Sequence, residues 1–369
     1  MTRVISVSAR NFRSYERVDA QLGPGLTVVS GPNGAGKTNL LEAVYFGCTG
    51  RSCRTSNDRQ LVRFGAQTLR VVVQCDGEAG SHQLAVGLTA GEAKRTSVDG
   101  VTLQRLLDSP HRPLVSVFLP DRLELVKGLP ALRRAHVDQV VAALWPARVG
   151  SRVAYAQTLA QRNALLVALR SGKANMATLD SWDAQLSVTA LALMATRAAA
   201  IDLIAQRFAQ VGGALALDGK LSVSYEPRSH AGDPVAFAAE LRQRRTEDME
   251  RGFTEYGPHR DDITIKRDGR SLRTYGSQGQ QRLALLALLL AERSVLAQQR
   301  SGIPLMLLDD VMSELDSVRR RALIDLLHRD GGQALITTTD LEHVPVENND
   351  VMRLQVSDSF VEPLAIGRA

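Results

Sequence analysis

The sequence has few residues from which a disulfide framework or a metal site could be built. Only three cysteines occur among 369 residues, Cys48, Cys53 and Cys75. Their number is odd and no two form a C-x-x-C pair, which argues against both disulfides and a thiolate zinc site. His259 lies beside acidic residues, but a lone histidine lacks the ligand set that a metal needs. A reducing, cytoplasmic setting is the simplest expectation.

Long hydrophobic runs are also missing. The most apolar run, residues 283–291, is about half of the ~18 residues that suggest a membrane span, and is typical of a buried helix. The first residues lack the apolar core of a signal peptide. We find neither an internal repeat nor a sustained heptad pattern. The sequence therefore predicts no membrane partner, no export and no long coiled coil.

Positive charge exceeds negative charge in this chain. The net charge is +6 and the pI is near 9.5, which favours an anionic partner, with nucleic acid first and an acidic membrane surface second. A basic surface that only maintains solubility is the open alternative. Two arginine clusters are candidates for DNA contact, although the second is also typical of a solvated helix face. They comprise Arg51, Arg54, Arg59 and Arg63, and Arg242, Arg244 and Arg245.

A glycine-rich segment between an apolar run at 26–29 and a helix-like stretch at 39–44 has the strand, loop and helix pattern of a P-loop. Glycines let backbone N–H groups converge on phosphate oxygens, and the helix N-terminus attracts the anion. We expect Lys37 to reach the β- and γ-phosphates of ATP and Thr38 to bind Mg²⁺. The alternative is a turn that matches by chance. The candidate nucleotide ligands are Gly31, Pro32, Asn33, Gly34, Ala35, Gly36, Lys37 and Thr38.

A second group of candidate site residues follows the apolar run 304–308. Asp309 and Asp310 end that run, as a Walker B strand requires. Asp309 is expected to hold Mg²⁺ beside Thr38, and Asp310 to orient or deprotonate the attacking water, so Asp310 and Lys37 are the catalytic candidates. An ordinary turn at a strand end is the alternative, and the order of motifs argues against it.

The pattern along the chain changes twice. The first third reads as α/β with antiparallel additions, with strands near 3–7, 26–29, 69–73, 83–88 and 114–119. Residues 132–210 then have long helical periodicity, and α/β patterns return near residue 263. We therefore predict an ATPase head from residues 1–130 and 252–369, with an inserted helical second lobe at 131–251.

The order of these motifs resembles the heads of ABC-type ATPases, in which a Ser-Gly-Gly-Gln signature precedes Walker B. Ser277, Gly279 and Gln280 match that signature, with Gln278 in place of the first glycine. In such heads the signature reaches the nucleotide held by a partner subunit. The resemblance therefore implies an ATP-dependent homodimer, with these three residues as further nucleotide ligands.

Nearly the whole chain resembles the RecF family of bacterial replication and recombination-repair proteins. The matching stretches include residues 11–15, 50–52, 120–138, 256–262, 307–316 and 337–340. The resemblance implies binding of single-stranded, gapped and double-stranded DNA, and cooperation with RecR and RecO type mediators in loading recombinase at single-strand gaps. A place in the SOS response to DNA damage is implied as well.

Slow hydrolysis is expected for two reasons. The family resemblance implies a weak, DNA-stimulated ATPase that acts as a switch. In addition, transporter-type heads carry a glutamine and a histidine at places that look like Pro120-Asp121 and Thr338-Thr339-Asp340 here. An ABC transporter-type subunit and an SMC-like structural head are the alternative functions. The first conflicts with those missing residues and the basic pI, and the second with the shortness of the helical insertion.

Overall fold

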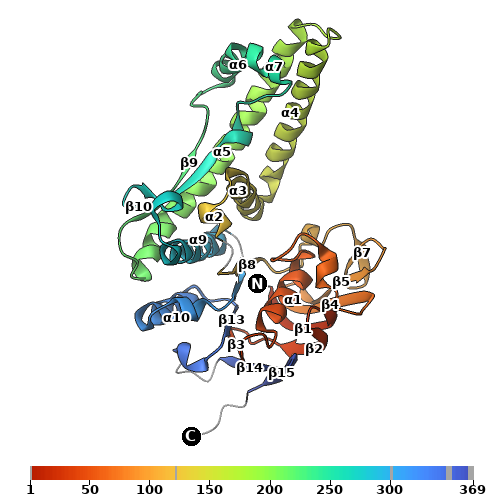
Figure 1. Ribbon diagram of the computed structural model, residues 1–369, viewed down its shortest axis with the longest axis vertical. Coiled ribbons are helices and arrows are strands. Elements are labelled where there is room, and N and C mark those ends of the chain that lie inside the picture. The colour runs from red at the N-terminus through yellow and green to blue at the C-terminus, as the bar shows by residue number, and fades with distance from the viewer. Residues whose placement is uncertain (1, 121–122, 300–301, 346–350, 365–369) are drawn as a thin grey trace. The chain divides into compact units, whose positions relative to one another are not determined.

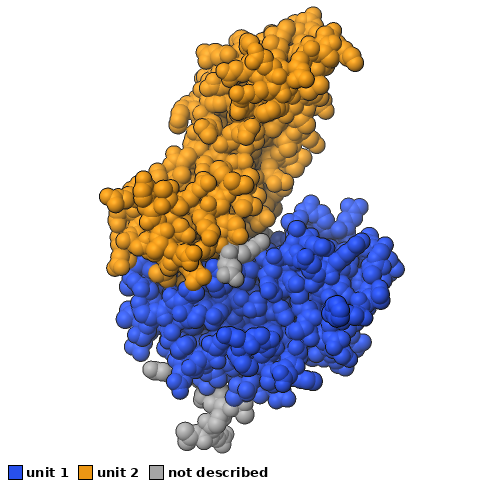
Figure 2. Space-filling view, viewed as in Figure 1, with its two compact units in different colours: residues 1–122, 213–217, 293–369 blue, residues 123–212, 218–292 orange. Residues whose placement is uncertain are grey.

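The computed structural model describes residues 2–120, 123–299, 302–345 and 351–364 (Figure 1). Contacts divide the chain into two compact units, coloured blue and orange in Figure 2. Unit 1 contains residues 1–122, 213–217 and 293–369, and unit 2 contains residues 123–212 and 218–292. We expected residues 252–292 in the head, whereas their contacts lie in unit 2. The assignment of the ATPase head and the helical lobe to residue ranges stays a prediction.

Unit 1 contains a six-stranded sheet in the order β15-β14-β3-β13-β12-β8. From β14 to β8 the neighbouring strands are parallel, and β15 pairs antiparallel with β14. Strands β3, β12 and β13 are entirely buried. Their sequences are mainly apolar, with buried hydroxyl side chains in β3 and β13. Their carboxyl ends share one edge, where ligands of such sheets bind. The strands are β3 (Leu26–Ser30), β8 (Val115–Phe118), β12 (Leu305–Leu308), β13 (Ala334–Thr338), β14 (Met352–Ser357) and β15 (Phe360–Pro363).

A second sheet in unit 1 supplies the predicted antiparallel additions. Its order is β2-β1-β4-β5-β6-β7, and every neighbouring pair is antiparallel. Alternate residues of β4 are buried, from Leu69 to Cys75, as expected for a sheet with one face in the core. That core includes residues of helix α1 (Lys37–Thr49). The strands are β1 (Arg3–Phe12), β2 (Tyr15–Gln21), β4 (Thr68–Gly77), β5 (Gly80–Thr89), β6 (Arg95–Val98) and β7 (Val101–Leu103).

The other elements of unit 1 are mostly single turns after the strands. Helix α10 (Ser317–Asp330) begins at Asp316, whose carboxylate accepts a hydrogen bond from the Arg319 N–H in an N-cap. The 3-10 turns are η1 (Asp58–Leu61), η2 (Leu106–Asp108), η5 (Val311–Glu314) and η6 (Leu341–His343).

Unit 2 is mainly helical, as expected for the inserted segment. Apolar side chains of α4, α5 and α6 form one core cluster there. A three-stranded sheet, β11-β10-β9, completes the unit. Its elements are α2 (Glu124–Lys127), α3 (Pro130–Leu144), η3 (Pro146–Arg148), α4 (Val149–Arg170), α5 (Ala177–Ala214), β9 (Leu221–Glu226), α6 (Pro234–Gln243), α7 (Arg245–Arg251), η4 (Pro258–Arg260), β10 (Asp262–Arg267), β11 (Arg270–Ser271), α8 (Leu272–Tyr275) and most of α9 (Gln278–Gln299).

Helix α5, with 38 residues, is long and apolar enough to cross a membrane by length and composition alone. It nevertheless carries two buried charged side chains, Asp183 and Arg197. Arg197 makes a two-pronged contact with Asp138 of α3, with N–O distances of 2.7 and 2.9 Å. Charged side chains are almost never fully buried unless they are paired, so this contact shows α5 packed against a neighbouring helix.

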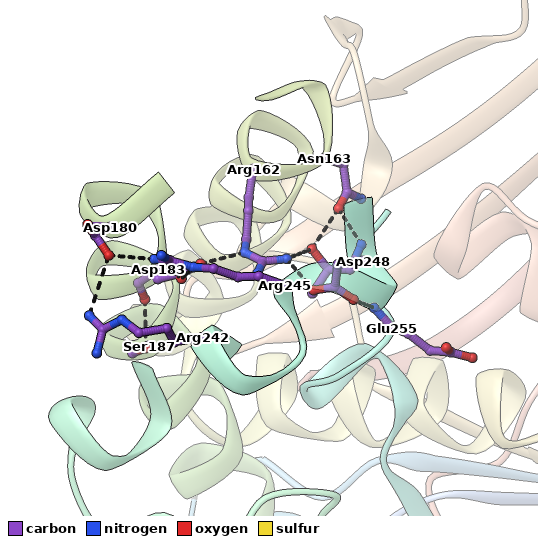
Figure 3. A network of polar contacts seen from close by, with 10 residues as sticks. Arg162, Asn163, Asp180, Asp183, Ser187, Arg242, Arg245, Asp248 and Glu255 are labelled. Carbon is purple, nitrogen blue, oxygen red and sulfur yellow. Dashed lines mark hydrogen bonds and ion pairs between the residues drawn. The ribbon is translucent and has the colours of Figure 1, made fainter. Parts of the chain in front are cut away.

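A buried ionic network joins α4, α5 and α7 (Figure 3). Arg162 of α4 donates hydrogen bonds to Asp183 of α5 and Asp248 of α7, both at 2.7 Å. It also donates to the hydroxyl of Thr254 at 2.6 Å, and Arg245 donates to Asp183 as well. All three members of the central triad are fully buried. Such a triad fixes how the helices meet, because each charge depends on its partners.

The network changes the interpretation of the second arginine cluster. Arg245 is only 12% exposed and contacts Asp180 as well as Asp183. The guanidinium of Arg244 lies over the ring of Tyr256, 4.2 Å from its centroid. Arg242 is 58% exposed and pairs with Asp180 at 3.4 Å. This cluster is therefore largely engaged within the unit.

We expect Arg162→Met to destabilise the protein by about 3–5 kcal/mol, because Asp248 then loses its ionic partner while it is buried. Urea unfolding monitored by circular dichroism measures this change. Arg242→Gln is the matched control, because it removes an exposed pair and should cost under about 1 kcal/mol. Equal unfolding midpoints for the two variants would show that the buried triad contributes nothing.

Candidate nucleotide-binding site

The P-loop joins the buried strand β3 to helix α1 at the shared edge of the parallel sheet. Two of its glycines are required by geometry. A Cβ on Gly31 would lie 2.2 Å from the backbone oxygen of Val356, and Gly31 has a φ of 153°. Gly36 has a φ of 115°, and a Cβ there would lie 2.9 Å from the Tyr15 hydroxyl. The loop thus keeps its turn and presents backbone rather than side chains, as a phosphate cradle needs.

Lys37 occupies the first position of α1 and is buried. Its ammonium group donates hydrogen bonds to the backbone oxygens of Gly31 and Pro32, at 2.7 and 2.9 Å. Burial lowers the pKa of Lys37, and the nearby carboxylates of Asp310 and Asp309 raise it. The charge is therefore held against the loop, where the phosphates of a bound nucleotide would lie.

The structure brings Thr38 and Asp309 together, although 271 residues separate them in the sequence. The Thr38 hydroxyl lies 2.9 and 3.0 Å from the two carboxylate oxygens of Asp309. Thr337 at the end of β13 also donates to Asp309, at 2.7 Å. Burial raises the pKa of Asp309, while the hydrogen bonds from Thr337 and Thr38 lower it. A hydroxyl and a carboxylate in contact are oxygen ligands of the kind that Mg²⁺ prefers, so these residues fit that ion.

Asp310 lies directly beyond Asp309 and has an unusual backbone. Its φ is 43°, in the left-handed region that non-glycine residues rarely occupy. Its N–H donates to the Thr337 hydroxyl at 2.9 Å, and Ser313 donates to one of its carboxylate oxygens at 3.0 Å. The other oxygen is buried and has no hydrogen-bond partner within the described ranges. The carboxylate of Asp310 also lies close enough to Lys37 to raise the pKa of that ammonium group.

Residues 11–15 support the P-loop, a role that sequence reasoning missed. The Tyr15 hydroxyl donates to the Gly36 backbone oxygen at 3.0 Å. Arg13 forms a two-pronged contact with the fully buried Glu42 of α1, at 2.8 and 3.0 Å. Ser14 accepts a hydrogen bond from Asn39 at 2.9 Å. The resemblance of these residues to a family motif was the available signal, but it gave no partner for Arg13.

The signature residues belong to unit 2, whereas the P-loop belongs to unit 1. The Ser277 N–H donates to the Gln280 side chain at 3.0 Å, and the Gln280 N–H donates to the Ser277 hydroxyl at 3.3 Å. This reciprocal pair is a capping box, which explains why α9 begins here. Ser277 and Gly279 are exposed. A capped, exposed N-terminus of a 22-residue helix can attract an anion.

The remaining predicted positions are partly described. Asp121 lies outside the described residues. Thr338, Thr339 and Asp340 stand at the end of β13, where transporter-type heads carry a histidine, and the Thr338 hydroxyl donates to the Asp340 backbone oxygen at 2.8 Å.

Both ring nitrogens of His259 are engaged, by the Tyr155 hydroxyl at 2.6 Å and the Thr254 backbone oxygen at 2.9 Å. Among the described residues there is no cluster of potential metal ligands, and burial lowers the pKa of His259.

Comparisons with known proteins agree with this geometry. Residues 6–99 match the AAA domain family. The Smc head domain from Pyrococcus furiosus is similar in fold, with a TM-score of 0.61 at 17% identity over 99% of this chain and 96% of that chain. The fold, the glycine-rich loop and the acidic strand end together define a P-loop ATPase of the ABC head type.

Closer relatives define the family. Two solved structures of the recombination mediator protein RecF, one with ATP and one with ATPγS, have TM-scores of 0.84 and 0.81. Each is 26% identical and covers 99% of this chain and 98% of its own. The DNA replication and repair protein RecF of Anaeromyxobacter dehalogenans is 37% identical over 98% of this chain and 99% of its own length. The RecF protein of Heliobacterium modesticaldum is 36% identical over 92% of this chain and 93% of its own length. The chain belongs to the RecF family of DNA replication and repair proteins.

Proposed function

We propose that this protein is an ATP-driven DNA-binding switch that acts in the cytoplasm during repair and replication. The contact between Thr38 of the P-loop and Asp309, the residue after β12, carries the proposal, because it joins the phosphate cradle to the acidic strand end. The RecF structures that contain ATP and ATPγS support ATP as the nucleotide.

In this proposal each residue has a separate task. Lys37 neutralises the β- and γ-phosphates, and the loop at residues 31–38 surrounds them with backbone N–H groups from every residue except Pro32. Thr38 and Asp309 hold Mg²⁺, which when bound neutralises charge on the phosphate oxygens. Asp310 orients or deprotonates the water that attacks the γ-phosphate. Turnover is slow, because threonine stands where transporter-type heads carry a histidine.

The ATP-bound state is a homodimer in this proposal. Ser277, Gly279 and Gln280 of one copy approach the nucleotide on the P-loop of the other. Support comes from the exposure of Ser277 and Gly279 at a capped helix N-terminus, where backbone N–H groups favour an anion.

DNA is the proposed macromolecular ligand, in single-stranded, gapped or double-stranded form. The basic pI of about 9.5 supports this. Arg51 and Arg59 are exposed and have no ionic partner within the described ranges. Arg54 lies 3.4 Å from Glu42, and Arg63 3.4 Å from Glu16. The two RecF structures are described within the RecFOR pathway, which supports RecR and RecO type mediators as partners in loading recombinase and a role in the response to DNA damage.

Binding of gapped duplex DNA tests this function. We expect Mg²⁺ and ATP to strengthen binding, and the logarithm of the association constant to fall with log salt by about 0.9 for each phosphate contacted. Vesicles of anionic lipid are the control surface. Binding to vesicles but not to DNA would favour a transporter-type subunit instead.

The variant Asp310→Asn separates binding from hydrolysis in the same assay. It keeps Asp309 and Thr38, so nucleotide binding persists, but the amide is a poor proton acceptor, and we expect hydrolysis to fall by about 10²-fold or more. ATP-dependent DNA complexes should then accumulate and dissociate more slowly. A parental hydrolysis rate in Asp310→Asn would show that another group activates the water.

A further inference from the structure

The outer face of the antiparallel sheet carries a row of arginines that the nucleotide site does not use. Arg10 of β1 lies directly opposite Arg17 of β2 on one side and Arg70 of β4 on the other. Arg70 in turn lies opposite Gly87 of β5, which lies opposite Arg95 of β6. Residues directly opposite in an antiparallel sheet point to the same face. Four arginines therefore stand in one line across five strands.

This arrangement does not stabilise the sheet. Like charges directly opposite each other are destabilising. The two outer members have carboxylate partners, since Arg17 contacts Asp19 at 2.8 Å and Arg95 contacts Glu92 at 2.9 Å. Arg10 and Arg70 are exposed, and neither forms an ion pair or a side-chain hydrogen bond with any residue that the structure describes. Two adjacent guanidinium groups thus face each other without a direct ion pair to any described residue.

The neighbouring residues form a shallow site around Arg10 and Arg70. Arg10 and Arg70 line a hollow of about 360 Å³ together with Ser8, Asp19, Val72, Gln74 and Gln83. The single carboxylate, Asp19, is already bonded to Ser8 at 2.6 Å and to Arg17. These bonds, with the charges of Arg17 and Arg10, lower the pKa of Asp19, while slight burial raises it. The hollow therefore combines surplus positive charge with hydroxyl and amide donors.

We propose that this sheet face binds the sugar–phosphate backbone of DNA, as a surface separate from the cluster Arg51, Arg54, Arg59 and Arg63. The proposal rests on the proposed function and names a surface for it. Arginine, serine and glutamine side chains are typical contacts of phosphate and sugar. Strands lie about 4.8 Å apart, so a row across five strands is about 19 Å long. This length suits several phosphates in succession better than one small anion.

The test compares the double variant Arg10→Gln/Arg70→Gln with the parent in DNA titrations over a range of salt concentrations. We expect the slope of log affinity against log salt to become shallower by about two, one unit for each lost phosphate contact. ATP affinity should not change, because neither residue contacts the P-loop. The thermal midpoint without DNA should stay equal or rise, because two opposed like charges are removed.

The control is Arg321→Gln/Arg329→Gln, which removes two exposed charges from α10 in the same unit. It should leave the salt slope within about half a unit of the parent. If both double variants change the salt slope of DNA binding equally, the effect comes from net charge alone, and the assignment of DNA binding to this sheet face fails. If Arg10→Gln/Arg70→Gln keeps the parental salt slope for DNA but loses affinity for polyglutamate, the face binds an acidic protein segment and the proposal is wrong. If the parent binds no DNA at all, the proposed function fails rather than this surface alone.

Discussion

Lys37→Ala is expected to weaken ATP binding by about 100-fold or more. The ammonium group of Lys37 is the cation held against the loop carbonyls of Gly31 and Pro32. Charge-assisted hydrogen bonds of this kind contribute about 1.5–3 kcal/mol each, and about 2.8 kcal/mol corresponds to 100-fold in dissociation constant. Dimerisation and ATP-dependent DNA binding should be lost as a consequence. Equilibrium titration with a fluorescent ATP analogue measures the change.

The matched control for this variant is Lys94→Ala in the same unit. Lys94 also donates to a backbone oxygen, that of Gly50, and pairs with Asp58 at 2.6 Å. Its removal should leave ATP affinity within about twofold, because it lies outside the P-loop. Urea unfolding of Lys37→Ala verifies that the variant is folded. A folded Lys37→Ala protein with parental ATP affinity would refute the P-loop assignment.

The segments of the candidate nucleotide site were recognisable in the sequence, because each is short, while the roles given to their residues stay predictions. Residues 31–38 and the pair Asp309 and Asp310 were identified from local spacing, and the parallel sheet brings Thr38 within 3.0 Å of Asp309. What the pattern could not provide is the role of Thr337. Its hydroxyl donates to Asp309 and accepts the N–H of Asp310, so it orients both acids. That role depends on the pairing of β13 with β12, which no local pattern specifies.

Contacts between remote segments account for the other differences from the sequence-based expectation. Helical periodicity indicated a charged helix near Arg245, but it contained no information on Asp183, 62 residues away. The division of the chain by contacts near residue 252 has a similar basis. Strand β10 pairs with β9 through contacts such as Ile263 with Tyr225, and this pairing draws the later segment into unit 2. Antiparallel partners are set by tertiary packing, whereas residue patterns report only the type of element.

Ser277→Arg should have the second large effect, on dimerisation rather than on nucleotide affinity. Lys37, Thr38 and Asp309 are unchanged in this variant, so monomers should bind ATP nearly as the parent does. A bulky cation at the exposed start of α9 would obstruct the approach of a second copy, and hydrolysis should fall to background. Sedimentation with and without ATP, together with ATPase rates, measures both effects.

The control for Ser277→Arg must separate the interface from the helix cap. Loss of the capping box costs about 1 kcal/mol in itself, so Ser277→Asn, which keeps a good cap and a small neutral side chain, should retain ATP-dependent dimers. Mixing Ser277→Arg with Lys37→Ala sharpens the test. In the mixed dimer one composite site carries both defects and the other carries neither, so part of the ATPase activity should return. A Ser277→Arg protein that dimerises with ATP and hydrolyses it at the parental rate would exclude a nucleotide shared between two copies.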